Sequence, residues 1–191
     1  IYRTNNRDGY FSLYLCEAAT GKVLKRLTDV NADVEMVGQD DKFVYYTSAE
    51  VSPVDNHLFR VEVKSGKKTR LTQAEGWHKV TMSGDMKYFV DNYSSLKVPR
   101  VILLVQNDGK KVKELLKAED PTKDYNFGEI TLGTVKSADG KFNNYYRLIK
   151  PMNFDASRKY PVIVYVYGGP HSQMVKNTWQ AEMRRWEMYM A

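Results

Sequence analysis

The residues best suited to catalysis in this sequence are two tyrosines that come just before a pair of glycines. Tyr165 and Tyr167 end a strongly apolar run, and Gly168-Gly169-Pro170 follows at once. A phenol at the carboxyl end of a strand would lie where open α/β sheets bind their ligands. Its hydroxyl could donate to the oxyanion that develops when a carbonyl is attacked, and the glycines would let a substrate approach the backbone closely. An ordinary turn explains the same residues without any chemistry, so both interpretations stay open.

The sequence gives little support for a catalytic histidine, a disulfide or a metal site. His57 and His78 lie in a strand-rich region and are expected to have surface or inter-strand roles, while His171 follows a proline in a turn. None of these histidines has the spacing of a metal site, and no Gly-x-Gly-x-x-Gly occurs, so we expect neither metal nor cofactor. The single cysteine, Cys16, excludes an internal disulfide and is expected to be a buried thiol.

The tyrosines need a strand to position them. The run Pro161–Tyr167 is almost continuously apolar, which is typical of a strand covered on both faces inside an α/β sheet. Two further strands are expected at Ile130–Lys136 and Tyr145–Ile149, with a turn at Ala138-Asp139-Gly140 between the first of them and the second.

A helix is expected after the glycines. Asn177 can cap it, and Gln180 lies three residues further on, as in a capping box. Four apolar residues then recur at helical spacing and predict one face packed into a core: Trp179, Met183, Trp186 and Met190.

The first two thirds of the sequence are repetitive. A Gly-Lys turn recurs three times, each time with a leucine a few residues later, and Leu27, Leu71 and Leu115 are 44 residues apart each time. A unit of about four short antiparallel strands with this period is typical of a β-propeller blade. We therefore expect about two and a half blades over residues 1–117, with strands that include Phe11–Leu15, Leu58–Val63 and Val101–Val105. An antiparallel sandwich with coincidental spacing is the alternative.

Composition and charge narrow the class of protein. Of 191 residues, 42% are hydrophobic and 13% aromatic, which excludes disorder of the whole chain. The net charge of +6 comes from scattered basic residues, so nucleic-acid binding is not expected. The longest apolar run, Val162–Tyr167, is far shorter than the roughly 20 residues of a membrane span. The sequence begins at Ile1 without a signal-type segment, and we expect it to be a piece of a longer protein.

The sequence resembles the prolyl oligopeptidase family of serine peptidases. After the repeats and a linker it carries Arg147-Leu148-Ile149-Lys150-Pro151, Lys159-Tyr160-Pro161 and Val166-Tyr167-Gly168-Gly169-Pro170-His171-Ser172-Gln173. The last segment is most similar to the dipeptidyl peptidase IV branch, and Asp8-Gly9-Tyr10 and Tyr45-Tyr46-Thr47 resemble late propeller blades of that branch. The resemblance covers essentially the whole chain.

The resemblance implies a mostly β architecture in three parts. Residues 1–117 would be the last blades of a β-propeller, 118–127 a linker, and 128–191 the first strands and helix of an α/β-hydrolase catalytic domain. It implies a periplasmic, secreted or cell-surface exopeptidase that releases Xaa-Pro or Xaa-Ala dipeptides from peptides with a free N-terminus. By motif match, Tyr167 would be an oxyanion-hole donor, with Tyr165 the poorer candidate. A homodimer of the parent protein is among the expected assemblies. Separately, the exposed blade edges of this piece would favour association between its own copies, and such a dimer could result from the cut itself.

The sequence departs from the family pattern at the nucleophile. No Gly-x-Ser-x-Gly occurs in it, so the serine, and the Asp and His that follow it in the family, are expected beyond Ala191. The acidic pair that holds the substrate amine in this branch is expected before Ile1, and His171 is not expected to be the catalytic base. The chain alone would then be inert. Another peptidase of the family, of endopeptidase or acylaminoacyl type, and a non-enzymatic propeller that binds a partner remain as alternatives.

Overall fold

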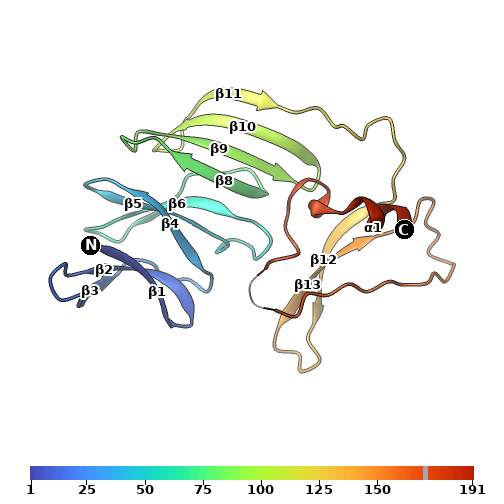
Figure 1. Cartoon of the computed structure of the whole chain (residues 1–191), viewed down its shortest axis with the longest axis horizontal. Coiled ribbons are helices and arrows are strands. Elements are labelled where there is room, and N and C mark those ends of the chain that lie inside the picture. Colours follow the sequence, from blue (N-terminus) through green and yellow to red (C-terminus); the bar gives the residue numbers. More distant parts are fainter. Residues whose placement is uncertain (170–171) are drawn as a thin grey trace.

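A computed structural model describes residues 1–169 and 172–191, and antiparallel sheets dominate it (Figure 1). The first sheet contains β1 (Tyr2–Asp8), β2 (Tyr10–Cys16) and β3 (Val23–Arg26). The second contains β4 (Val34–Gln39), β5 (Phe43–Ser48), β6 (His57–Glu62) and β7 (Lys68–Arg70). The third contains β8 (Trp77–Met82), β9 (Tyr88–Ser95), β10 (Val98–Gln106) and β11 (Lys111–Lys117).

Each of these sheets is a meander in which strands that follow one another in the chain are hydrogen-bonded neighbours. The repeated glycines Gly21, Gly66 and Gly109 precede the last strand of each sheet and have φ of 70°, 78° and 94°. Positive φ of this kind is what tight hairpins require and what glycine adopts without a steric cost. The predicted four-stranded blade is thus confirmed in the second and third sheets, and the first sheet contains three strands.

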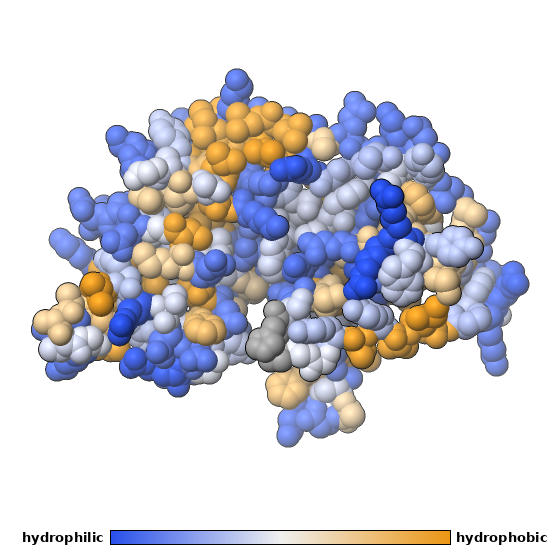
Figure 2. All heavy atoms as spheres, in the orientation of Figure 1, coloured by the Kyte–Doolittle hydropathy of each residue, from blue (hydrophilic) through white to orange (hydrophobic). Residues whose placement is uncertain are grey.

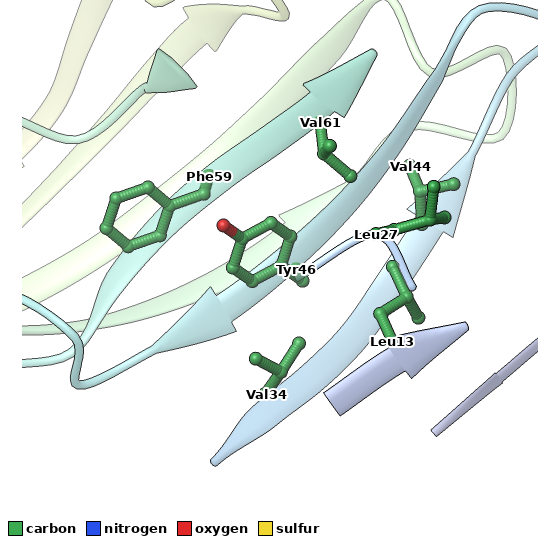
Figure 3. Packing of buried hydrophobic residues seen from close by; sticks show 7 residues of the cluster. All are labelled: Leu13, Leu27, Val34, Val44, Tyr46, Phe59 and Val61. Atoms are coloured by element: carbon green, nitrogen blue, oxygen red, sulfur yellow. The ribbon is translucent and has the colours of Figure 1, made fainter. Parts of the chain in front are cut away.

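The blades are held together by two apolar clusters that lie between neighbouring sheets. The cluster between the first and second sheets is drawn in Figure 3, and its buried members are Leu13, Leu27, Val34, Val44, Tyr46, Phe59 and Val61. The cluster between the second and third sheets contains Tyr45, Leu58, Leu71, Phe89 and Val105. Strand β6 contributes to both clusters, because successive side chains of a strand point to opposite faces. Burial on both faces is the reason that blades stack as they do.

The three repeated leucines do not share one environment. Leu27 and Leu71 are buried at 5% and 2% exposure, whereas Leu115 is 50% exposed on β11. Strand β11 forms the outer edge of the third sheet, and no other part of the described chain packs over Leu115 as a neighbouring blade would.

The chain leaves the third sheet at Lys117, the end of β11, and next forms a two-stranded sheet. Strands β12 (Ile130–Lys136) and β13 (Asn143–Ile149) pair antiparallel in register from Ile130↔Ile149 to Lys136↔Asn143. Gly140 has φ of 72° in the turn between them. The two predicted strands and their turn are confirmed.

The prediction of a buried strand over Pro161–Tyr167 is wrong for this structure. The segment is irregular, and Val162 and Val166 are 78% and 77% exposed. Figure 2 shows apolar side chains at the surface along this part of the chain. A strand needs a neighbour for its backbone hydrogen bonds; β12 and β13 pair only with each other, and no strand of the described residues pairs with this run.

The predicted helix after the glycines is also corrected. It is divided into a 3₁₀ turn, η1 (Trp179–Glu182), in which Gln180 and Ala181 have positive φ of 49° and 51°, and a short helix, α1 (Arg185–Met190). The division falls at Met183 and Arg184, where ψ is 137° and 149°. Asn177 caps neither η1 nor α1, whose N-cap residues are Thr178 and Arg184. Two members of the predicted core stripe, Trp186 and Met190, are 43% and 56% exposed. Among the described residues, no helix is long and apolar enough to cross a bilayer.

Candidate active-site edge

Tyr167 lies at the end of the exposed apolar segment and presents its phenol at the surface, with 45% of the residue exposed. The ring lies against Gly169: a Cβ added there would come within 3.0 Å of the Tyr167 hydroxyl oxygen and 3.1 Å of Cζ. A Cβ on Gly168 would meet nothing within 4 Å. The second glycine of the pair therefore makes room for the phenol. His171, which the sequence analysis set aside as a catalytic base, and Pro170 lie outside the described residues.

Tyr165, the second candidate, is covered by a cation. The Arg184 guanidinium carbon lies 4.7 Å from the centroid of the Tyr165 ring, a cation–π distance. A hydrogen bond to the Tyr165 hydroxyl raises the pKa of Arg184 above its ordinary value. Tyr165 thus joins the extended segment to the residue that precedes α1.

Arg184 is held in place by a nearly buried ion pair that joins β13 to α1. Arg147 Nη2 lies 2.8 Å from both carboxylate oxygens of Glu187, and Nη1 donates to the carbonyl of Ala181 at 2.6 Å. The side chains of Arg147 and Glu187 are 12% and 8% exposed. Glu187 also accepts the backbone N–H of Arg184 at 2.9 Å. Charge-assisted, two-pronged contacts of this kind fix geometry well.

Residues 173–180 cross from the tyrosine segment to the propeller blades. The side chain of Gln173 donates to the carbonyl of Pro53. Trp179 N donates to Ser94 Oγ at 3.2 Å, and Gln180 N donates to Leu96 O at 3.3 Å. These contacts tie the crossing segment to the blades, and no right-handed helix begins at Asn177 because Gln180, Ala181 and Glu182 have positive φ.

An open groove of ≈ 730 Å³ lies beside this crossing segment. Gln173 lines it together with three aromatic residues and two carboxylates from the blades: Tyr10, Phe11, Trp77, Asp33 and Glu35. One oxygen of Asp33 accepts the backbone N–H of Phe11 at 2.8 Å. The groove therefore presents acidic and aromatic side chains next to the segment that follows Tyr167.

The remaining histidines lie between strands and are buried. His78 Nδ1 is 2.8 Å from Asp91 Oδ1, and its Nε2 is 2.8 Å from Ala74 O. His57 Nδ1 is 3.1 Å from Thr72 Oγ1. Burial, with a smaller contribution from the charge of nearby His78, lowers the pKa of His57 to about 4. The inter-strand role is confirmed and the surface role is wrong.

The structure also shows where the single cysteine lies and how the potential metal ligands are distributed. Cys16 is buried at 3% exposure, as predicted. In the part of the chain that the structure describes, no three His, Cys, Asp or Glu side chains come together in a way that could hold a metal ion.

Sequence reasoning missed Arg147 and Glu187, and it assigned Asn177 to a helix cap. Arg147 and Glu187 are 40 residues apart, and no local pattern marks them as partners. Arg147 was visible in the sequence only as part of the segment that ends at Pro151.

Comparison with known proteins agrees with this architecture. The family profile described as "Dipeptidyl peptidase IV (DPP IV) N-terminal region" matches residues 1–100. Human dipeptidyl peptidase 8 is 32% identical over 147 residues, which is 71% of this chain and 16% of that protein. Dipeptidyl peptidase 4 of Arthroderma otae is 27% identical over 186 residues, which is 93% of this chain and 24% of that protein.

Solved structures agree as well. A putative dipeptidyl aminopeptidase IV from Bacteroides ovatus superposes with a TM-score of 0.88 at 37% identity, over 100% of this chain and 30% of that one. Dipeptidyl peptidase 4 of Porphyromonas gingivalis superposes with a TM-score of 0.88 at 29% identity, over 99% of this chain and 27% of that one. The chain thus spans less than a third of the length of these relatives. The profile match over residues 1–100 and these relatives together show that the chain belongs to the dipeptidyl peptidase IV branch of the prolyl oligopeptidase family.

Proposed function

We propose that this chain is part of a serine-type dipeptidyl peptidase and that Tyr167 donates a hydrogen bond to the oxyanion of the reaction. In this proposal residues 1–117 belong to the propeller, 118–127 link the two parts, and 128–191 open an α/β-hydrolase domain. The observation that carries it is the surface-exposed Tyr167 phenol resting on Gly169, in a chain of this family.

In this proposal the chain contributes to one step of the reaction, the stabilisation of the oxyanion. A serine nucleophile, supplied by residues outside residues 1–191, would attack the carbonyl of the second residue of the substrate. The carbonyl oxygen then becomes an oxyanion, and the Tyr167 O–H would donate to it. A backbone N–H beside the nucleophile would be the other donor, as in oxyanion holes generally.

The proposed substrates are peptides with a free N-terminus and proline or alanine in the second position. The named relatives are dipeptidyl peptidases, and this preference follows the family resemblance. In the full-length enzyme we expect hydrolysis of Gly-Pro-nitroanilide and none of its N-blocked counterpart. Hydrolysis of both would favour an endopeptidase or acylaminoacyl-type enzyme, and hydrolysis of neither would favour a binding propeller. Residues 1–191 alone are expected to hydrolyse neither compound.

Replacing the proposed donor tests the assignment of Tyr167. Tyr167→Phe removes the hydroxyl and keeps the ring, and loss of one oxyanion donor typically costs roughly 10²–10³ in kcat. We expect that loss in the full-length enzyme, with the thermal unfolding midpoint unchanged because the phenol lies at the surface. Tyr165→Phe serves as the matched control and is expected to keep most of the activity. A Tyr167→Phe enzyme within twofold of the wild-type kcat would refute the assignment.

A further inference from the structure

The segment that carries Tyr167 belongs to a long loop that is closed at its base. Residues 165–169 and 172–184 of this loop are described, and at its two ends the Arg184 guanidinium lies 4.7 Å from the Tyr165 ring centroid. Glu187 and Arg147 hold the returning end, as described above. Tyr167 therefore lies two residues from a fixed base.

The far side of this loop is fastened to two propeller blades by one residue, Asn177. Its Nδ2 donates to Asp55 Oδ1 at 2.8 Å, and its backbone N–H donates to Val54 O at 2.7 Å. Both acceptors lie in the loop between β5 and β6 of the second sheet. Its Oδ1 accepts the backbone N–H of Leu96, between β9 and β10 of the third sheet, at 2.8 Å.

The anchor on the second blade is itself rigidly held. Asp55 is 9% exposed, and the oxygen that Asn177 contacts also accepts the backbone N–H of Gly76 at 3.1 Å. Gln173 adds a second contact to the same loop at Pro53. Asn177 thus uses both ends of its amide on two different blades, which a helix-capping asparagine does not do.

We infer that Asn177 is a positioning residue for Tyr167: it transmits the placement of the second and third blades to the oxyanion donor. This inference rests on the proposed function of Tyr167. The physical reason is that a phenol on an exposed segment donates well only when both limbs of its loop are fixed, and a displacement of about 1 Å can cost up to 10²-fold in rate. One limb is fixed at Tyr165–Arg184 and the other at Asn177.

The decisive experiment combines two substitutions in the full-length enzyme. Asn177→Ala alone is expected to lower kcat about tenfold with KM within twofold. In a Tyr167→Phe background the same substitution is expected to change kcat less than twofold, because Asn177 would act through a hydroxyl that is already gone. A tenfold further loss in the double variant would overturn the inference. If Tyr167→Phe alone leaves kcat unchanged, it is the proposed function that fails.

A second measurement separates positioning from general loosening. A dipeptide that ends in a proline boronate forms a tetrahedral adduct with the nucleophile, and an oxygen of that adduct takes the place of the oxyanion, whereas an aminoacyl-pyrrolidide lacks this carbonyl altogether. Asn177→Ala is expected to weaken boronate binding about tenfold and to leave pyrrolidide binding unchanged; equal weakening of both would contradict the inference. Asn126→Ala, at an exposed position of the linker, is the matched control and should change neither. If Asn177→Ala fails to fold, Asn177→Gln, which keeps the amide and moves it by one methylene, is measured in its place and is expected to lower kcat in the Tyr167 enzyme but not in the Tyr167→Phe background; equal losses in both would overturn the inference.

Discussion

At the scale of single residues, the two glycines after Tyr167 differ in what surrounds them. Neither has a backbone in the left-handed region, so alanine is not excluded by conformation at either position. A Cβ on Gly169 would press on the Tyr167 ring at 3.0–3.2 Å, and a Cβ on Gly168 would face open space. The same substitution at adjacent positions therefore isolates the packing of the phenol.

We expect Gly169→Ala to lower kcat of the full-length enzyme about tenfold, because the phenol must move by a few tenths of an ångström or turn away. Gly168→Ala should stay within twofold of wild type. Steady-state hydrolysis of Gly-Pro-nitroanilide measures both, and equal losses at the two positions would show that contact with Gly169 does not place the ring.

At the scale of elements, the hairpin β12–β13 and the helix α1 are joined by the pair Arg147–Glu187. With 12% and 8% exposure, these side chains are desolvated enough that an unpaired charge would be costly. The pair holds α1, and with it Arg184 over Tyr165.

Breaking this pair is expected to cost more than removing it. Glu187→Leu should lower the free energy of unfolding by about 3 kcal/mol, because Arg147 loses its carboxylate inside the protein. The double variant Arg147→Met with Glu187→Leu should be more stable than Glu187→Leu alone. Denaturant unfolding of the wild type, of the single variants Arg147→Met and Glu187→Leu, and of the double variant completes the cycle; additive single effects would mean that the pair is not coupled.

At the scale of the whole molecule, the second and third sheets are joined across a buried group of polar side chains as well as across apolar residues. The rings of His57 and His78 lie 5.0 Å apart, and His78 stacks on Tyr93 at 4.7 Å. Because burial keeps His57 neutral, this contact between blades is sensitive to acid.

The sign of the pH effect follows from the lowered pKa. The unfolded chain takes up a proton on His57 near pH 6.5, while the folded protein does so only near pH 4. The contribution to stability is therefore intact above pH 6.5 and is lost as the pH falls toward 4, by about 2 kcal/mol at pH 5. We expect His57→Gln, which cannot titrate, to lose about that much less between pH 7 and pH 5. Equal losses in urea unfolding of both proteins would contradict this.

The amino-acid sequence by itself determined the blades and the hairpin β12–β13. The Leu27–Leu71 spacing, the glycines of the turns and the alternation along β6 are local patterns, and they correspond directly to strands, tight turns and two buried faces. It also singled out Tyr167 as a candidate, although its role as a donor stays a prediction.

The tertiary structure alone decided what surrounds that tyrosine. Pro161–Tyr167 has the composition of a strand, but a strand forms only when a neighbour accepts its hydrogen bonds, and the described residues provide none for it. Asn177 has the chemistry of a helix cap, yet Asp55 and Leu96 take both ends of its amide. Partners 81 and 122 residues distant leave no periodic mark in a sequence, because only the folded chain brings them together.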